Sequence, residues 1–195
     1  MNIMDKEIEL NVKQVFESQT KPGIFGVILE DKNTPPKQIP LVIGEKEAHA
    51  IYCAINKILP TRPLTHDLMV SCFDFANLDI LKILIYKMDV GVYYSYIYIK
   101  HEDEFTRIDS RTSDAIALAL RTNSPIFILE DLLNRECVEQ VVRNDDLSTL
   151  TKELEEELEQ HNIQKETLQK KLKEAVEKED YELASILRDK IAELD

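Results

Sequence analysis

The sequence of 195 residues is poor in cysteine, and its few cysteines are widely spaced. Cys53, Cys72 and Cys137 form no CxxC motif and no zinc knuckle, so we expect three reduced thiols rather than a disulfide framework or a structural zinc site. Cys53 and Cys72 lie in apolar helical stretches, where a free cysteine behaves as a small core residue.

Long apolar runs are also lacking. No segment reaches the length of a membrane span, which predicts a protein without membrane contact. At the N-terminal end, Asp5, Lys6 and Glu7 interrupt the sequence too early for the apolar region of a signal peptide. A cytoplasmic location is therefore expected, which agrees with reduced cysteines.

Basic residues are in the minority, and the formal net charge is −13. Residues 1–146 carry 16 Lys and Arg against 23 Asp and Glu, and residues 147–195 carry 8 against 14. Because nonspecific nucleic-acid binding depends on Lys and Arg that neutralise phosphates, this balance argues against a protein that coats DNA. It remains compatible with a nuclease whose metal ions offset nearby carboxylates.

The residues that are present predict an α+β domain with a mixed, largely antiparallel sheet. Strands are expected at 8–16, 24–29, 39–43, 80–85, 92–99, 105–109 and 126–129. Helices are expected at 45–59, 65–76, 112–121 and 130–135, with Thr65 as an N-cap. Hairpins alternate with helices instead of repeating βα units, which is typical of the α+β class.

A row of tyrosines marks the expected strand at 92–99. Tyr94, Tyr96 and Tyr98 share one face of it, and Ser95 and Ile97 lie on the other. The row could stack on nucleic-acid bases, or it could lie on the core or on a subunit interface.

The C-terminal part changes character and predicts helices. From Leu147 to Ala175 a heptad seam repeats, with polar interruptions, and a break is expected near His161 and Asn162. Asp180 can cap a further helix with an apolar stripe. We expect an α+β domain at 1–135, a helical connector at 136–162 and a helical hairpin at 163–195. Heptads and a flat tyrosine face also favour a homo-oligomer.

Three segments, in order, resemble the bifunctional nuclease domain family. They are L-V-I-G-E-K-E-A-H-A-I at 41–51, R-P-L-T-H-D-L-M at 62–69, and I-D-S-R-T-S-D-A-I-A-L-A-L-R at 108–121 followed by P-I-F-I-L. Thr112 stands where the family usually has proline, a mild change because threonine can begin a helix. The tail at 168–194 resembles the UvrB/UvrC-type (UVR) motif through Ala175, Asp180, Tyr181, Ala184, Arg188 and Asp189. This resemblance implies a hairpin that binds a protein partner.

The resemblance implies cleavage of DNA and RNA, which needs an activated water and groups that bind phosphate. We expect catalytic roles for His66, Asp109 and Asp114, with His66 as a general base, and phosphate binding by Arg62 and Arg111. Carboxylates expected to bind Mg²⁺ or Mn²⁺ are Glu47, Asp67, Asp109 and Asp114.

The same residues have structural alternatives. Glu47, Asp67 and Asp114 each fall in the first turn of a predicted helix, where acidic side chains complement the helix dipole, and Asp114 can pair with Arg111. No GxSxG, Walker, HExxH or dinucleotide motif is present.

Three functions follow. The first is a metal-assisted nuclease on DNA or RNA, with a UVR hairpin that recruits a protein. The second is a non-enzymatic adaptor that docks onto a repair, protease or kinase system through the hairpin. The third is a sensor in which Arg62 and Arg111 bind an anionic metabolite.

Overall fold

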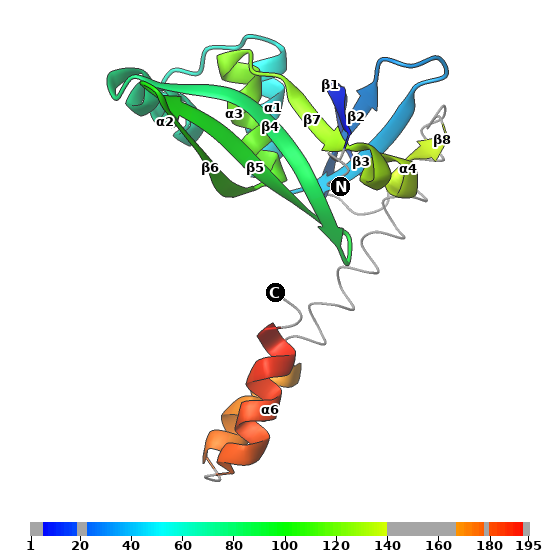
Figure 1. Ribbon diagram of the computed structural model, residues 1–195, viewed down its shortest axis with the longest axis vertical. Coiled ribbons are helices and arrows are strands. Elements are labelled where there is room, and N and C mark those ends of the chain that lie inside the picture. Colours follow the sequence, from blue (N-terminus) through cyan, green and yellow to red (C-terminus); the bar gives the residue numbers. More distant parts are fainter. Residues whose placement is uncertain (1–5, 19–22, 140–166, 178–179, 193–195) are drawn as a thin grey trace. The chain divides into compact units, whose positions relative to one another are not determined.

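The computed structural model of the protein describes residues 6–18, 23–139, 167–177 and 180–192 (Figure 1). The chain divides into two compact units, Met1–Lys152 and Glu153–Asp195.

The larger unit is built on one sheet of eight described strands. The strands are β1 (Glu7–Glu17), β2 (Phe25–Asp31), β3 (Lys37–Ile43), β4 (Leu78–Asp89), β5 (Val92–His101), β6 (Glu104–Arg111), β7 (Ile126–Leu129) and β8 (Val138–Glu139). Their order is β6-β5-β4-β7-β1-β2-β3-β8. Within the described part, β4 and β7 pair in parallel and the other neighbours pair antiparallel. The predicted mixed, largely antiparallel sheet is confirmed.

The long hairpin of β4 and β5 turns at Val90 and Gly91. Both residues have positive φ angles, 45° and 76°, and Asp89 pairs with Val92 on either side of them. Two central residues of positive φ define the tight turn whose twist matches antiparallel strands. Gly91 meets this requirement without strain, whereas Val90 adopts a conformation that β-branched residues disfavour.

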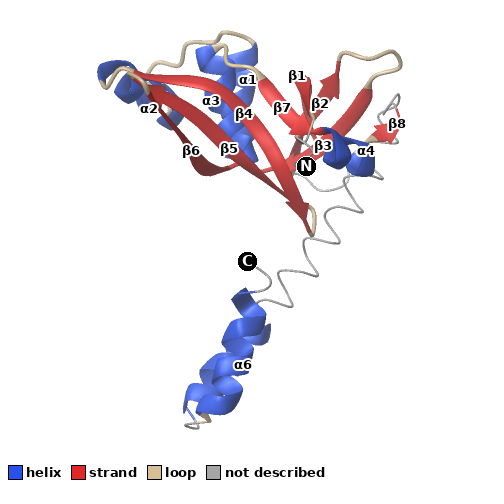
Figure 2. Cartoon of the chain, in the orientation of Figure 1, coloured by secondary structure: helices blue, strands red, loops and turns tan. Residues whose placement is uncertain are grey.

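Three helices pack together against the sheet: one lies over β4, β5 and β6, a second contacts it and β4, and the third contacts it together with β1 and β2 (Figure 2). They are α1 (Glu45–Ile55), α2 (Thr65–Phe75) and α3 (Thr112–Thr122), and a short α4 (Glu130–Glu136) packs near β7. The central helix is α3, whose residues Ala115 to Ala119 are fully buried. Its alanines let α1 approach closely, and Ile116 and Leu118 fill the core beside β4 and β5.

Three local expectations were wrong. The helix α1 ends at Ile55 instead of Leu59, because Lys57 takes a left-handed conformation, and Leu59 is 93% exposed. Thr65 is the first helical residue, and Leu64 occupies the cap position. Cys72 is exposed rather than part of the core, because it lies on the outer side of α2.

The smaller unit contains helical residues 167–177 and the helix α6 (Tyr181–Ala192). Ala175, Ala184 and Leu187 form its small core, with Leu168 and Leu172 against them. Asp180 caps α6 as expected, since its carboxylate accepts a hydrogen bond of 3.1 Å from the Leu183 amide. The heptad seam before residue 167, with the break near His161, and most of the predicted connector lie outside the described residues.

Candidate functional site

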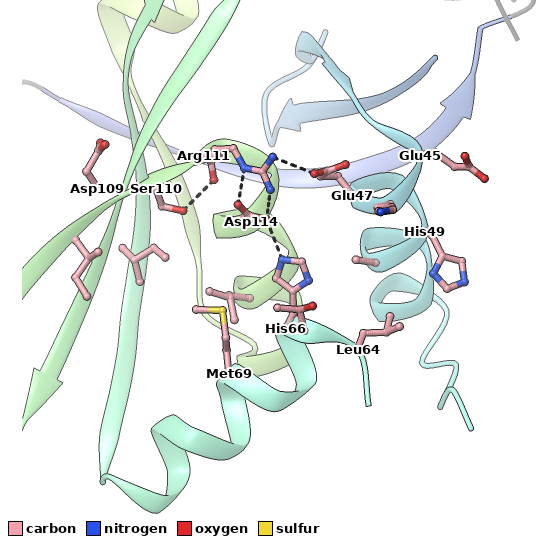
Figure 3. Close-up of a pocket in the computed structure, with 16 residues that line it drawn as sticks. Glu45, Glu47, His49, Leu64, His66, Met69, Asp109, Ser110, Arg111 and Asp114 are labelled. Atoms are coloured by element: carbon pink, nitrogen blue, oxygen red, sulfur yellow. Dashed lines mark hydrogen bonds and ion pairs between the residues drawn. The ribbon is translucent and has the colours of Figure 1, made fainter. Parts of the chain in front are cut away.

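Four charged or ionisable side chains form a cluster around Arg111, where β6 passes into α3 (Figure 3). The Arg111 guanidinium donates to both carboxylate oxygens of Asp114, from Nε at 2.8 Å and from Nη2 at 3.2 Å. Its Nη1 lies 3.0 Å from Oε1 of Glu47. His66 completes the group, with Nε2 at 3.0 Å from Oδ1 of Asp114. We call Glu47, His66, Arg111 and Asp114 the arginine cluster.

The cluster exists because three helices begin at the same place. Glu47, His66 and Asp114 lie in the first turns of α1, α2 and α3, and Arg111 is the cap residue of α3. Helix N-termini favour negative charge, so the two carboxylates are stabilised there before Arg111 pairs with them. The expectation that first-turn carboxylates complement helix dipoles and the expectation that they form a site are therefore compatible.

Gly44 leaves room for this arrangement. A Cβ atom at Gly44 would lie 2.6 Å from Oε2 of Glu47, closer than real Cβ contacts. A side chain at this position would push the Glu47 carboxylate away from its present place. The glycine just before α1 thus contributes to the geometry of the cluster.

The electrostatics keep Asp114 ionised. Burial alone would raise the pKa of Asp114, but hydrogen bonds from Arg111 and His66 outweigh it, and the pKa lies below its ordinary value. The pKa of Arg111 is raised mainly by its bond to Asp114. Because an ionised carboxylate only accepts hydrogen bonds, Nε2 of His66 carries the proton in their contact. In the neutral ring, Nδ1 then has the free lone pair.

The cluster opens into a pocket of about 830 Å³ between α1, α2 and the β5–β6 edge. Apolar side chains form much of its wall, namely Leu64, Met69, Ile97, Ile108 and Leu118. Polar residues at the pocket include Glu45, Lys46, His49, Asp109 and Ser110. A charged group beside an apolar wall suits a ligand with an anionic part and a flat, weakly polar part.

Asp67, one of the expected metal ligands, belongs to a different pair. Its Oδ1 lies 2.5 Å from Nε of Arg121, and its Oδ2 accepts from the Leu64 amide at 2.8 Å. Burial alone would raise the pKa of Asp67, but the Arg121 bond and the Leu64 amide lower it. Arg121 also donates from Nη1 to the carbonyl groups of Ala50 and Ala117. This pair ties α1, α2 and α3 together.

Asp109 and Arg62 also lie apart from the cluster. The Asp109 carboxylate accepts a hydrogen bond of 3.0 Å from the Tyr86 hydroxyl and points away from Arg111 and Asp114 (Figure 3). Arg62 is exposed in the connection between α1 and α2, and its side chain has no ion pair within the described part of the chain. The structure thus brings together four of the seven expected residues.

The predicted divalent metal would be held by carboxylates of the chain together with waters and substrate phosphates. Among the described residues, no group of three His, Cys, Asp or Glu side chains is placed to hold an ion. Glu47 and Asp114 are directed at the Arg111 guanidinium, which occupies the position that a cation would take between them. As arranged, the cluster does not fit a metal site, and the expected Mg²⁺ or Mn²⁺ stays a prediction.

Sequence reasoning missed two sets of residues that support the site. Arg121 was not considered, although an arginine in the last turn of an alanine-rich buried helix signals an internal partner. Buried Ser95 and Thr112 hydrogen bond at 2.7 Å, and Thr112 also donates to the Tyr93 carbonyl. These bonds fix the start of α3 beside Arg111. The available signal was one serine on the otherwise hydrophobic, helix-facing side of β5.

Comparisons with known proteins agree with this architecture. The model of the bifunctional nuclease domain matches residues 27–141, and the UvrB/UvrC motif matches residues 162–195. Two uncharacterized proteins, from two strains of Mycobacterium tuberculosis, are each 29% identical over 120 residues, which is 62% of this chain and 69% of theirs. None of the described helices is both long and apolar enough to cross a membrane. The chain therefore belongs to the bifunctional nuclease domain family and ends in a UVR motif.

Proposed function

We propose that this protein is a nuclease that hydrolyses phosphodiester bonds of DNA or RNA, with the arginine cluster as its catalytic centre. The observation that carries the proposal is a solvent-accessible arginine held between two carboxylates, with a histidine bound to one of them, in a single pocket. The description of the family supports the reaction class.

Arg111 is suited to bind the phosphate. A guanidinium has five N–H groups: those on Nε and Nη2 of Arg111 donate to Asp114, and Nη1 forms an ion pair with Glu47. The terminal nitrogens keep further N–H groups that can donate to the oxygens of a phosphate. The side chain is 68% exposed, so a phosphate can reach these donors.

His66 is suited to activate water. Asp114 holds the Nε2 proton and fixes the orientation of the ring, which leaves Nδ1 to accept a proton from an attacking water. When the ring becomes an imidazolium, the adjacent Asp114 carboxylate stabilises its charge, as in other histidine–aspartate pairs. Asp114 is thus a positioning residue in the hydrolytic step.

The charge balance of the cluster bears on the predicted metal. Two carboxylates face one guanidinium, so the cluster with a neutral His66 is net negative and repels a phosphate over longer distances. This supports the prediction that activity depends on Mg²⁺ or Mn²⁺, which would offset the excess negative charge.

The experiment is a nuclease assay of the full chain on single-stranded DNA, duplex DNA and RNA, with Mg²⁺, Mn²⁺ or a chelator. We expect Arg111→Met and His66→Gln to lose activity. Arg135→Gln is the matched control, since it removes a positive charge from exposed Arg135 in α4. Asp109→Ala tests the predicted catalytic role of Asp109, because cleavage equal to that of the wild type would dismiss it. Equal cleavage by the wild type and both cluster variants would exclude this centre.

An adaptor without enzymatic activity is the second candidate. It is favoured by the fact that the charged groups of the cluster already satisfy one another, and by the UVR motif at the C-terminal end. In either case we propose that the hairpin recruits a protein partner. A pull-down that compares the full chain with a chain truncated after Asp146 tests this role. Loss of partners on truncation, without hydrolysis by the full chain, favours the adaptor.

A further inference from the structure

The face of β4 and β5 opposite to helices α1–α3 presents a row of half-buried tyrosines. In β5, Ser95, Ile97 and Ile99 are buried toward the helices, so Tyr94, Tyr96 and Tyr98 lie on the other side of the sheet. Tyr86 of β4 joins them, with its ring stacked on that of Tyr96 at a centroid distance of 3.9 Å. We call Tyr86, Tyr94, Tyr96 and Tyr98 the tyrosine face. It is the side of this hairpin that the described helices do not cover (Figure 2).

A cation lies over each tyrosine of the β5 row. Lys87 Nζ is 4.8 Å from the ring centre of Tyr94, and Lys82 Nζ is 4.8 Å from that of Tyr98. The Arg107 guanidinium lies 4.3 Å from the ring centre of Tyr96.

The cations on this face differ in how far they are neutralised. Lys82 pairs with Glu7, and Lys87 pairs with Asp89. Arg107 and Lys100, which lies over Phe105, have no carboxylate partner among the described residues. The face therefore combines aromatic rings with available positive charge, in a chain whose net charge is −13.

We propose that the tyrosine face binds single-stranded nucleic acid. The inference rests on the proposed function, because the bound strand is the substrate that the arginine cluster cleaves. Proteins that bind single strands without sequence preference combine stacked aromatic side chains with cations that follow the backbone. Duplexes keep their bases stacked on one another, so a flat aromatic row has no base faces to contact in them.

The spacing of the row favours an extended strand. Residues of a β-strand rise about 3.4 Å each, which places alternate tyrosines about 6.8 Å apart. This is roughly twice the repeat of about 3.4 Å per nucleotide along one strand of a duplex. Bases that stack on neighbouring tyrosines must therefore be separated from one another, as they are in an unpaired, extended strand.

The cations do not block this binding. A cation over an exposed ring is held weakly, and stacking of a base on an aromatic ring is the stronger contact. A base can therefore displace Arg107 from Tyr96, and the freed guanidinium then binds the neighbouring phosphate.

The strand register connects the tyrosine face with the arginine cluster. Tyr98 pairs with Arg107, Tyr96 with Asp109 and Tyr94 with Arg111. A nucleic acid that follows the row from Tyr98 to Tyr94 thus reaches the end of β6 at which Arg111 lies. Since β6 is the edge strand of the described sheet, the bound nucleic acid can pass around this edge into the pocket. Asp109 holds Tyr86 by a hydrogen bond at this crossing point.

The test measures binding separately from cleavage. In a His66→Gln background, the affinity for a fluorescein-labelled oligothymidylate is followed by anisotropy for the full chain. We expect Tyr96→Leu and Arg107→Gln each to weaken binding about tenfold. The control variant Arg135→Gln should leave binding unchanged. A duplex of equal length should bind more weakly and be insensitive to Tyr96→Leu.

Cleavage of a minimal phosphodiester, bis(p-nitrophenyl) phosphate, separates this inference from the proposed function. With His66 present, Tyr96→Leu and Arg107→Gln should keep the wild-type rate on this small substrate, whereas Arg111→Met should lose it. Lost oligonucleotide binding without any cleavage supports the tyrosine face and contradicts the nuclease. Normal binding by both face variants, with cleavage intact, overturns the tyrosine face alone.

Self-association is the competing use of this surface. Light scattering with size exclusion should give the same molar mass for the wild type and for Arg107→Gln, whose exposed side chain is not part of the core. A dimer that Arg107→Gln converts to a monomer, with oligonucleotide binding unchanged, would assign the tyrosine face to a second copy of the chain and overturn the proposal.

Discussion

Two arginine–aspartate pairs connect the helices of the larger unit, and they differ in what they leave free. Arg121 is 9% exposed, and it is bound by Asp67 and by two backbone carbonyl groups. Arg111 is 68% exposed, and it donates two hydrogen bonds to Asp114 and pairs with Glu47, which leaves it further N–H groups. Both pairs involve an aspartate in the first turn of a helix. Exposure and unused donors, not pairing itself, distinguish a candidate site from a structural contact.

The largest expected effect is on catalysis, and it concerns the exposed pair. Arg111→Met should lower kcat/KM by about 10²–10³-fold, the usual loss when one donor to a transition-state oxygen is removed. The free energy of unfolding of Arg111→Met should differ from that of the wild type by less than about 1 kcal/mol, because exposed ion pairs contribute little to stability. Kinetics on an oligonucleotide and urea unfolding check both values. A loss of stability equal to that of the corresponding Arg121 variant would remove the distinction between the pairs.

The buried pair should show the opposite pattern. Arg121→Met leaves Asp67 and two carbonyl groups without their partner, and should lower the free energy of unfolding by about 3 kcal/mol. The activity of the fraction that remains folded should fall less than tenfold, since Arg121 does not line the pocket. Urea unfolding followed by circular dichroism gives the stability. A fully stable but inactive variant would contradict the structural role.

Metal binding probes the balance of charge in the exposed cluster. If Mg²⁺ or Mn²⁺ binds to Glu47 and Asp114, it competes with Arg111 for them. Arg111→Met should then bind Mn²⁺ roughly tenfold more tightly than the wild type, because a repelling charge is removed. Isothermal titration measures this directly, with Arg121→Met as the control. Equal affinity in the wild type and Arg111→Met would place any bound ion elsewhere.

Acid should weaken both pairs. The pKa of Asp67 and the pKa of Asp114 are lowered in the folded chain, so each contributes stability above the unfolded value of about 3.9. This stability is lost as the pH falls from that value through the lower folded pKa. Unfolding free energies between pH 5 and pH 2 should decrease, and less steeply in Asp67→Asn. An unchanged slope in that variant would argue against a strong Asp67–Arg121 interaction.

The smallest effect is expected at Gly44. Gly44→Ala adds a methyl group that displaces Glu47 from Arg111, which should lower kcat/KM at most about fivefold, the value of one exposed ion pair. The mutation should leave the thermal midpoint nearly unchanged. Glu47→Gln gives the reference value, and a double mutant with effects that add fully would show that Gly44 acts independently of Glu47.

Much of the fold followed from the sequence, because periodicity determines strands and helices locally. The strand that holds Tyr94 and Ile97 alternates clearly, and the helix α3 was expected from its many alanines and leucines, which favour helices. The end of α1 was harder to predict, since apolar Ile58 and Leu59 continue the pattern beyond the point where Lys57 turns the backbone. The spacing of apolar side chains along the sequence does not reveal a residue at which the backbone leaves the helical conformation.

The site was only partly predictable for a geometric reason. Asp109 and Arg111 are two residues apart in a strand, so both should lie on the tyrosine side of the sheet. Arg111, however, is also the cap of α3, and its side chain reaches the helices, whereas Asp109 remains with Tyr86. His66 and Asp67 are adjacent on a helix and cannot face the same partner. Such divergence depends on where one element ends and the next begins.

The hairpin at the C-terminal end buries only part of its apolar surface between its own helices. Its interior holds Ala175, Ala184 and Leu187, while Val176, Tyr181, Leu183 and Ile186 remain open to solvent. So small an interior gives two helices little reserve against unfolding. A partner that covers these exposed side chains would complete the apolar core of the hairpin. The unfolding temperature of the hairpin would then rise with the concentration of that partner.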